Sequence, residues 1–253
     1  MKRLIAIATL VFGNIVWFYA MKSYNDMRQV HIVNVTLLSV MEVSGMGMVI
    51  KRIPYMKFKG TKVIEVGYHY KKIGFSRNMT GTGIFVSNDG LILTAAHVVN
   101  RTPLAEISLN GFGTPPKLIK GFKPKKLFAT VVGVDQKHDI ALLRVINPGQ
   151  HFRAVRLRKE VEKGLQVFTV GFPGEFQKHV TSGIVSSFNE GFTMTDVVIA
   201  HGSSGGGLFD MDGKLVGLCS FMRYMEPLEV YQGFSGFTDL TAMHKLLNKY
   251  EAI

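Results

Sequence analysis

The sequence has a single cysteine and few acidic residues. Because Cys219 stands alone, the 253-residue chain cannot form an intrachain disulfide or a zinc site with several cysteine ligands. Its 18 Asp and Glu face 30 Lys and Arg, which gives a formal net charge of +12. With 47% hydrophobic residues, a chain of this length buries a core and is not disordered. The charge allows nucleic acid or an anionic membrane as a partner, and composition alone does not choose between them.

An uncharged run follows two basic residues at the N-terminus. It extends from Leu4 to Ala20, and as a helix it would be roughly 25 Å long, close to the minimum for crossing a bilayer core. Phe18 occupies the third-last position of the run, where a cleaved signal sequence prefers a small residue. We therefore expect residues 1–21 to be an uncleaved signal-anchor or transmembrane segment, with its basic start in the cytoplasm and the rest exported.

A second apolar segment, residues 32–50, keeps another topology open. If it also crossed the membrane, the chain would form a hairpin with both ends in the cytoplasm. Glu42 in mid-segment, the β-branched residues, and the helix-weakening Gly45 and Gly47 all argue against a membrane helix. We expect residues 22–60 to form a stalk or membrane-proximal segment and residues 61–253 to form the main domain.

The rest of the chain consists of short apolar runs separated by turn signals. The runs Leu91–Leu93 and Leu215–Leu218, for example, each follow a turn signal, Asp89-Gly90 and Asp212-Gly213. Only residues 240–250 have the apolar spacing of an amphipathic helix. The pattern predicts an all-β sandwich or a pair of barrels followed by one C-terminal helix.

Three segments carry the residue types of a nucleophilic catalyst. They contain the sequences Thr94-Ala95-Ala96-His97-Val98-Val99, His138-Asp139-Ile140-Ala141-Leu142-Leu143 and Gly202-Ser203-Ser204-Gly205-Gly206-Gly207. A serine hydroxyl is a weak nucleophile until an imidazole takes its proton, and the imidazole needs a carboxylate to fix its tautomer. His97, Asp139 and Ser204 fit these roles. The surrounding glycines let the amides of Gly202 and Ser204 point toward one atom, as an oxyanion hole requires.

These segments resemble those of trypsin-like serine proteases, most closely the HtrA/Deg branch. That branch shares a Thr-x-Ala-His-Val-Val motif, an Asp-Leu-Ala-Leu-Leu motif and Gly-Asn-Ser-Gly-Gly-Pro, in this order. The stretches Gly171–Gly174 and Val180–Ser186 are similar to two further family stretches, and the resemblance spans roughly residues 75 to 248. It implies an all-β fold of two six-stranded antiparallel barrels with the active site between them. It also implies a serine endopeptidase that acts on polypeptides and uses no cofactor or metal.

The sequence departs from this family at two positions beside Ser204. Ser203 stands where the family has Asn or Asp, so activation by a newly cut N-terminus that pairs with an Asp is not expected. Gly207 stands where the family has Pro, and it restricts φ less at the start of the next strand. Because the chain ends at Ile253, soon after the expected helix, we expect the protease domain without a PDZ domain.

The residues of the specificity pocket are expected from their positions relative to Ser204. Val198 is expected at its floor, and Ser220, Phe221 and Met222 along its wall. Because no acidic residue lies at the floor, we expect an apolar side chain of small to medium size, and not Lys or Arg, before the cleaved bond.

The basic residues gather in two places, after the apolar segments and in the loop between the His97 and Asp139 motifs. They form a solvated face or attract an anionic membrane surface or an acidic partner. Nucleic acid is not expected, because the aromatic residues are not interleaved with the basic clusters as a stacking platform requires.

The leading hypothesis is a membrane-anchored, HtrA-like serine endopeptidase that faces the periplasm or the extracellular space. One alternative is a catalytically silent relative that binds peptides in the same cleft. Another is a viral-type processing protease that faces the cytoplasm. The N-terminal region carries no motif that settles oligomerisation, which leaves a homo-oligomer open.

Overall fold

The computed structural model describes residues 28–29, 32, 40–59, 62–99, 102–109, 125–172, 179–225 and 230–251. Within these ranges, no helix has both the length and the apolar character needed to span a membrane. The expected signal-anchor, residues 1–21, lies outside the described residues, and so does the first part of the apolar segment at residues 32–50. From Val40 onward that segment is β-strand.

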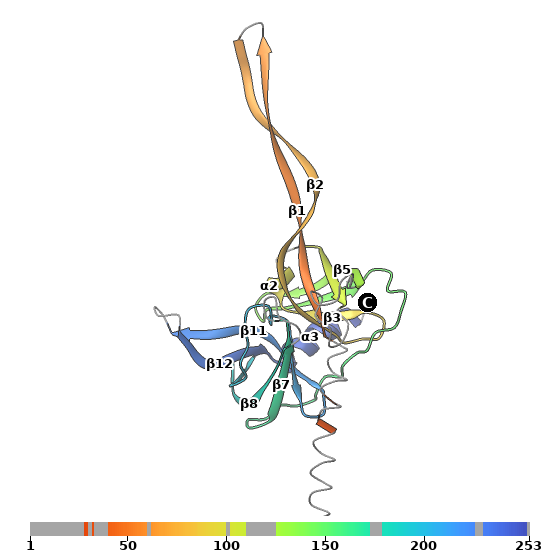
Figure 1. The fold of residues 1–253 in the computed structure, drawn as a ribbon, viewed down its shortest axis with the longest axis vertical. Coiled ribbons are helices and arrows are strands. Elements are labelled where there is room, and N and C mark those ends of the chain that lie inside the picture. The colour runs from red at the N-terminus through yellow and green to blue at the C-terminus, as the bar shows by residue number, and fades with distance from the viewer. Residues whose placement is uncertain are drawn as a thin grey trace, which may run out of the picture.

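Two closed antiparallel barrels of six strands each account for most of the described residues (Figure 1). The first has the order β1-β2-β3-β6-β5-β4 and the second β10-β11-β12-β9-β8-β7. The strands of the first barrel are β1 (Val40–Lys59), β2 (Lys62–Phe85), β3 (Leu91–Thr94), β4 (Leu104–Leu109), β5 (Lys125–Asp135) and β6 (Ile140–Val145). Those of the second are β7 (Gln166–Gly171), β8 (His179–Asn189), β9 (Phe192–Thr195), β10 (Gly207–Asp210), β11 (Leu215–Met225) and β12 (Val230–Thr238). The predicted pair of six-stranded barrels is confirmed.

Strands between the barrels are apolar on both faces, which explains their continuous hydrophobic runs. In β3, Leu91 and Leu93 belong to the core cluster that reaches into the second barrel, whereas Ile92 belongs to the interior of the first. The same alternation in β6 sends Leu142 to the shared cluster and Leu143 to the interior. Because successive strand residues face opposite sides, each strand contributes to two cores. The two barrels are therefore joined by a common apolar layer.

Helix α3 (Leu240–Glu251) follows β12 of the second barrel and confirms the predicted C-terminal helix. Its apolar residues Leu240, Met243 and Leu246 lie in the shared core cluster. Near its end, the ring of Tyr250 lies so close to Gly133 of β5 that a Cβ on this glycine would be 2.3 Å from the ring. The helix thus leaves one barrel and packs against the other.

A long two-stranded ribbon made by β1 and β2 projects away from both barrels (Figure 1). The two strands pair from Val40↔Ile84 to Lys59↔Lys62. Among the described residues, β1 pairs with β4 only over Glu42–Gly45. The first barrel therefore contains part of the segment expected as a stalk, residues 22–60, and the expected boundary at residue 61 falls in sequence between the paired strands β1 and β2.

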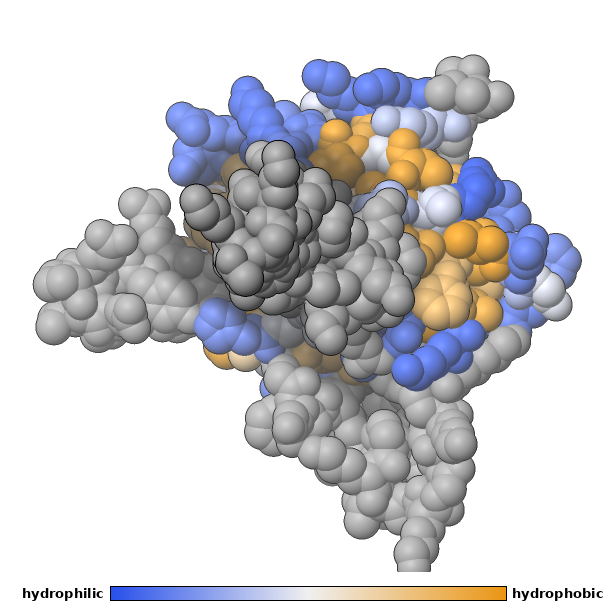
Figure 2. Space-filling view, turned by 90° about the horizontal axis from the view of Figure 1, so that it is seen from above, coloured by the Kyte–Doolittle hydropathy of each residue, from blue (hydrophilic) through white to orange (hydrophobic). Residues whose placement is uncertain are grey.

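The outer surface carries apolar as well as polar side chains. Seen from above, apolar residues gather on one face within a border of hydrophilic ones (Figure 2). On β8, Ile184 and Phe188 are exposed, whereas Val185 between them is buried. This is the alternation expected of a strand with one face on the core.

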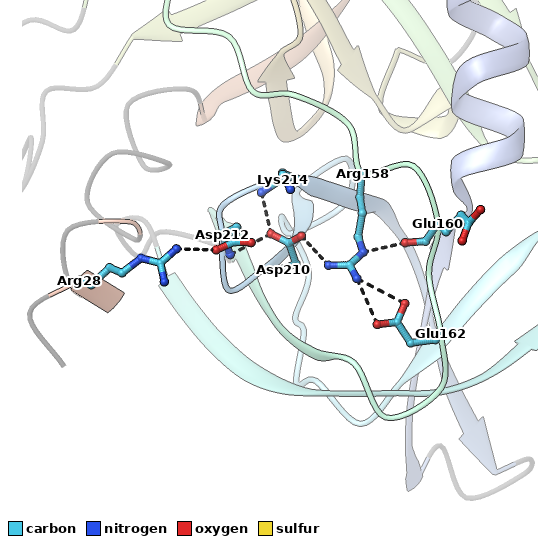
Figure 3. Close-up of polar contacts among 7 residues, drawn as sticks. All are labelled: Arg28, Arg158, Glu160, Glu162, Asp210, Asp212 and Lys214. Carbon is cyan, nitrogen blue, oxygen red and sulfur yellow. Dashed lines mark hydrogen bonds and ion pairs between the residues drawn. The ribbon is translucent and has the colours of Figure 1, made fainter. Parts of the chain in front are cut away.

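A buried carboxylate organises the turn between β10 and β11 (Figure 3). The side chain of Asp210 is only 2% exposed, and one of its oxygens accepts hydrogen bonds of 2.9 Å from the amides of Asp212 and Lys214. Its other oxygen accepts a hydrogen bond of 2.8 Å from Arg158. This bond is the main reason that the pKa of Arg158 is raised. Arg158 also forms an ion pair with Glu162 at 3.1 Å.

Replacing Asp210 by Ala is expected to lower the free energy of unfolding by about 3 kcal/mol, because it leaves two turn amides without their partner and Arg158 without its buried carboxylate. Asp212→Ala is the matched control in the same turn. Among the described residues, the side chain of Asp212 forms an ion pair with Arg28 at 2.8 Å, and both side chains are about half exposed. Its loss should cost less than about 0.5 kcal/mol. Urea unfolding of both variants measures the difference, and equal losses would contradict the role of Asp210.

Candidate active site

His97 lies in a one-turn helix at the end of β3, on the first barrel. This helix, α2 (Ala96–Val99), is anchored by Ala96, Val98 and Val99, which are buried. The hydroxyl of Thr94, at the end of β3, donates a hydrogen bond of 2.7 Å to the carbonyl of Thr82 on β2. These buried neighbours hold the helix in place, whereas the side chain of His97 is partly exposed.

Asp139 ends the turn between β5 and β6. Its φ is +52°, in the left-handed region that residues other than glycine adopt infrequently. Its backbone carbonyl accepts a hydrogen bond of 3.2 Å from the amide of Ala96. This bond ties the turn to α2, so that the carboxylate of Asp139 meets the imidazole of His97.

Three hydrogen bonds hold the carboxylate of Asp139. One oxygen accepts from the backbone amide of His97 at 3.0 Å, and the other lies 2.7 Å from Nδ1 of His97. The second oxygen also accepts a hydrogen bond of 2.5 Å from the hydroxyl of Ser220 on β11. His97 and Asp139 are therefore brought together as the sequence predicted. Ser220 is a supporting donor that was not foreseen, since its contact joins residues 81 positions apart.

These hydrogen bonds keep the carboxyl group of Asp139 ionised. Burial by itself would raise its pKa, but the bonds from the His97 side chain, Ser220 and the His97 amide outweigh burial and hold the pKa below its ordinary value. An ionised carboxylate only accepts hydrogen bonds, so Nδ1 of His97 is the donor. In the neutral imidazole Nε2 then carries the lone pair, which is the state a general base needs.

Ser204 follows a tight turn of the second barrel. The amide of Ser203 donates a hydrogen bond of 2.9 Å to the carbonyl of Ala200, and Gly202 between them has a φ of +95°. This pattern is that of a type II turn, which favours glycine at its third position. The amides of Gly205 and Gly206 are also bonded, at 2.7 Å, to the carbonyls of Cys219 and Ser203.

Two amides of this loop have no such partner. Within the described residues, neither Gly202 nor Ser204 donates its amide to a backbone carbonyl, although their neighbours in the loop do. These are the two amides that the sequence assigned to an oxyanion hole. An oxyanion hole requires amides of this kind, which do not already donate to a backbone carbonyl.

The loop that contains Ser204 is docked onto the first barrel. The amide of Thr82 donates a hydrogen bond of 2.8 Å to the carbonyl of Ser204. Gly205 has a φ of +78°, and a Cβ at this position would lie 2.2 Å from the carbonyl oxygen of Thr82 and 2.7 Å from the amide nitrogen of Ala95. Only glycine allows this approach, which places Ser204 beside the segment that carries His97.

The hydroxyl of Ser204 is not hydrogen-bonded to His97 in the described part of the chain. In free enzymes such bonds are often long, and they shorten when substrate binds. The structure thus shows the His97–Asp139 pair directly and the nucleophile loop seated next to it.

Three of the four residues expected in the specificity pocket lie on one strand of the second barrel. Ser220, Phe221 and Met222 follow one another on β11, opposite β12. The ring of Phe221 covers Gly236 of β12, since a Cβ there would lie 2.3 Å from the ring.

Val198, the fourth expected pocket residue, lies in the segment between β9 and the Ser204 loop. It is 59% exposed and lines a cavity of about 240 Å³ together with residues of β7, β8 and the Ser204 loop. The described lining of this cavity contains none of the three β11 residues. The next residue, Ile199, is buried in the core of the second barrel.

Other reactive side chains offer no competing chemistry in the described residues. Cys219 is buried, and burial raises the pKa of its thiol, so the thiol stays protonated and is a poor nucleophile. No group of three or more His, Cys, Asp or Glu suited to a metal ion occurs within the described ranges.

Comparison with known proteins identifies relatives of this chain. The family described as the trypsin-like peptidase domain matches residues 81–218, more than half of the chain. A probable periplasmic serine endoprotease, DegP-like, from Halomonas elongata is 30% identical over 193 residues, which cover 67% of this chain and 38% of that protein. The serine protease HTRA1 of Xenopus laevis is 32% identical over 152 residues, which cover 55% of this chain and 30% of that protein.

The matched region spans less than two fifths of the length of these relatives. The family match includes strands β3 to β10, from both barrels, and the segments that contain His97, Asp139 and Ser204. The extent of the family match, together with the double-barrel fold, establishes that this chain belongs to the trypsin-like peptidase family, with relatives among the DegP-like and HTRA serine proteases.

Proposed function

We propose that the protein is a serine endopeptidase in which His97, Asp139 and Ser204 act as a catalytic triad. The hydrogen-bonded pair of His97 and Asp139 carries this proposal, because it prepares a base beside the docked nucleophile loop. The names of the relatives, which are serine endoproteases, support the same reaction.

In the acylation step, Nε2 of His97 takes the proton of the Ser204 hydroxyl as the oxygen attacks the carbonyl carbon of the peptide bond. The negative charge that develops on the substrate oxygen is stabilised by the amides of Gly202 and Ser204. The protonated imidazole then gives its proton to the leaving amine. Asp139 stays ionised throughout, and it stabilises the imidazolium while holding its orientation.

In the deacylation step, a water molecule takes the place of the amine. Nε2 of His97 removes a proton from this water, which attacks the acyl-enzyme carbonyl, and the imidazolium then returns the proton to Ser204. The same two amides serve the second oxyanion. All groups come from the protein, so these steps need no metal or cofactor.

We also propose that the active domain faces the extracytoplasmic side and is anchored by residues 1–21. The apolar run behind two basic residues supports an anchor, and the word periplasmic in the names of relatives supports the compartment. The substrate is then an exported polypeptide, and the absence of an acidic residue at position 198 favours an apolar side chain before the cleaved bond.

A fluorophosphonate probe tests the reaction on the full chain. It should inactivate peptide hydrolysis and label one residue, which mass spectrometry should identify as Ser204. The buried thiol of Cys219 and the neighbouring Ser203 should stay unlabelled. Folded protein that binds peptides but neither hydrolyses them nor reacts with the probe would overturn the proposal in favour of a silent binding module.

A further inference from the structure

A second His–Asp pair lies directly behind Asp139, in the same turn. Nδ1 of His138 lies 2.7 Å from one carboxylate oxygen of Asp135, and the other oxygen accepts from the amides of Lys137 at 3.0 Å and His138 at 3.3 Å. Burial alone would raise the pKa of Asp135, but the bonds from His138 hold it below its ordinary value. The carboxylate is therefore ionised and fixes the whole turn.

His138 also reaches across to the second barrel. Its carbonyl accepts a hydrogen bond of 2.6 Å from the hydroxyl of Thr238, which is fully buried at the end of β12. Its ring lies against Gly191 in the turn between β8 and β9, where a Cβ would be 2.7 Å from Cδ2 of the ring. The amide of Asp239 in turn donates to the carbonyl of Gly191 at 3.0 Å. One residue of the first barrel thus contacts two elements of the second.

These contacts bear directly on the backbone of Asp139. The φ and ψ angles of Asp139 set the relative orientation of the two peptide planes beside it, whose carbonyls belong to His138 and to Asp139 itself. Thr238 holds the first, and the amide of Ala96 holds the second at 3.2 Å. The left-handed value of +52° is uncommon for this residue type and persists only where the surroundings hold it.

We infer that His138, Asp135 and Thr238 form an inter-barrel clamp that positions Asp139 for catalysis. This inference rests on the proposed function. None of the three residues contacts the reacting atoms, so they are positioning residues that act through Asp139. The Ser204 loop belongs to the second barrel, whereas His97 and Asp139 belong to the first. The clamp therefore fixes the carboxylate relative to the barrel that carries the nucleophile.

Matched pairs of variants, made in the full chain, test whether Thr238 and His138 position Asp139 or only stabilise the fold. Thr238→Val removes the hydroxyl with little change of shape, whereas Thr238→Ser keeps it. His138→Leu removes the bond to Asp135, whereas His138→Asn keeps a donor near the position of Nδ1. We expect Thr238→Val and His138→Leu to lower kcat between about tenfold and a hundredfold with KM within twofold, because small misplacements of catalytic groups cost rates of this size. The Ser and Asn variants should recover most of the loss.

A spectroscopic readout reports on Asp139 itself. The low-field proton NMR signal of Nδ1–H of His97, which is shared with Asp139, should shift or broaden in Thr238→Val and His138→Leu. It should be unchanged in His151→Ala, a control in which an exposed histidine outside the site is removed.

In these experiments, a failure of the clamp can be told apart from a failure of the proposed function. Wild-type protein that neither reacts with the fluorophosphonate probe nor cleaves peptide would overturn the proposed function. An active wild type whose folded Thr238→Val and His138→Leu variants keep both kcat and the low-field signal would overturn the clamp alone. A fall in activity that follows only the fraction of unfolded protein, with the signal unchanged in the folded fraction, would also overturn it.

Discussion

Replacing Ser204 by Ala is expected to lower kcat for peptide hydrolysis by about 10⁶-fold. The hydroxyl is the atom that forms the acyl-enzyme, and residues of a triad act as a unit, so the loss of one removes nearly all of their joint effect. The residual rate should still exceed that of the uncatalysed reaction by about 10³-fold to 10⁴-fold, because the amides of Gly202 and Ser204 and the binding of substrate remain. Steady-state hydrolysis of a fluorogenic peptide by wild type and variant measures the ratio.

Ser182→Ala is the matched control, because this serine is exposed on β8 and is not among the residues that line the cavity beside Ser203. It should keep wild-type kcat and KM. The Ser204→Ala variant should retain its melting temperature within a few degrees, since the missing hydroxyl leaves the loop's backbone hydrogen bonds in place. Activity that survives in Ser204→Ala after removal of contaminating proteases would show that another residue is the nucleophile.

The barrels and the site segments were predictable because their signals are local. Leu91–Leu93 and the residues around Leu142 are apolar on both strand faces, and the sequence shows this as unbroken hydrophobic runs next to turn residues. The His97 and Asp139 motifs each lie in one short segment. The resemblance to the protease family added the pairing of His97 with Asp139, which composition and spacing do not contain.

The course of residues 40–59 was not predictable from such local signals. The sequence there runs from an apolar stretch with two glycines into Lys51 and Arg52, a pattern that suits a stalk as well as a strand. Pairing with β2 and β4, whose residues lie tens of positions further along the chain, places Val43 in the interior of the first barrel, and pairing with β2 places Val40 in the shared apolar layer. Register of this kind depends on the partner strand and not on the segment itself.

The specificity pocket shows a second limit of counting along the sequence. Val198 and Ile199 are adjacent, yet one is largely exposed and the other is buried in the barrel core. In extended chain, a shift of one residue exchanges the two faces. Counting from Ser204 therefore locates the segment but does not give the exposure of each side chain. Nor does it show that the hydroxyl of Ser220, expected in the pocket wall, donates to Asp139.

Replacing Asp139 by Asn is expected to lower kcat by about 10⁴-fold while KM changes little. The amide group is nearly the same size, and Asn accepts a left-handed φ readily, so the turn should keep its fold. A neutral amide can donate to Nδ1 of His97, and this favours the tautomer in which Nε2 carries the proton. Nε2 then cannot accept the proton of Ser204. The measurement is kcat and KM at neutral pH, with Asp196→Asn, at a carboxylate on the second barrel away from His97, as control.

The same pair of proteins tests whether Asp139 is held as an anion in the folded state. Because its pKa is lowered by folding, its ionised form adds stability above the ordinary value of 3.8, and this contribution is lost as the pH falls through the lower folded pKa. Asp139→Asn cannot show this loss. The stability of wild type relative to Asp139→Asn, from urea unfolding, should therefore decrease as the pH falls below about 4. The lowered pKa values of Asp89 and Asp135 affect both proteins and cancel in the comparison. A difference that stays constant down to acid pH would mean that the hydrogen bonds from His97 and Ser220 do not favour the carboxylate, and that Asp139 is not the anion the mechanism needs.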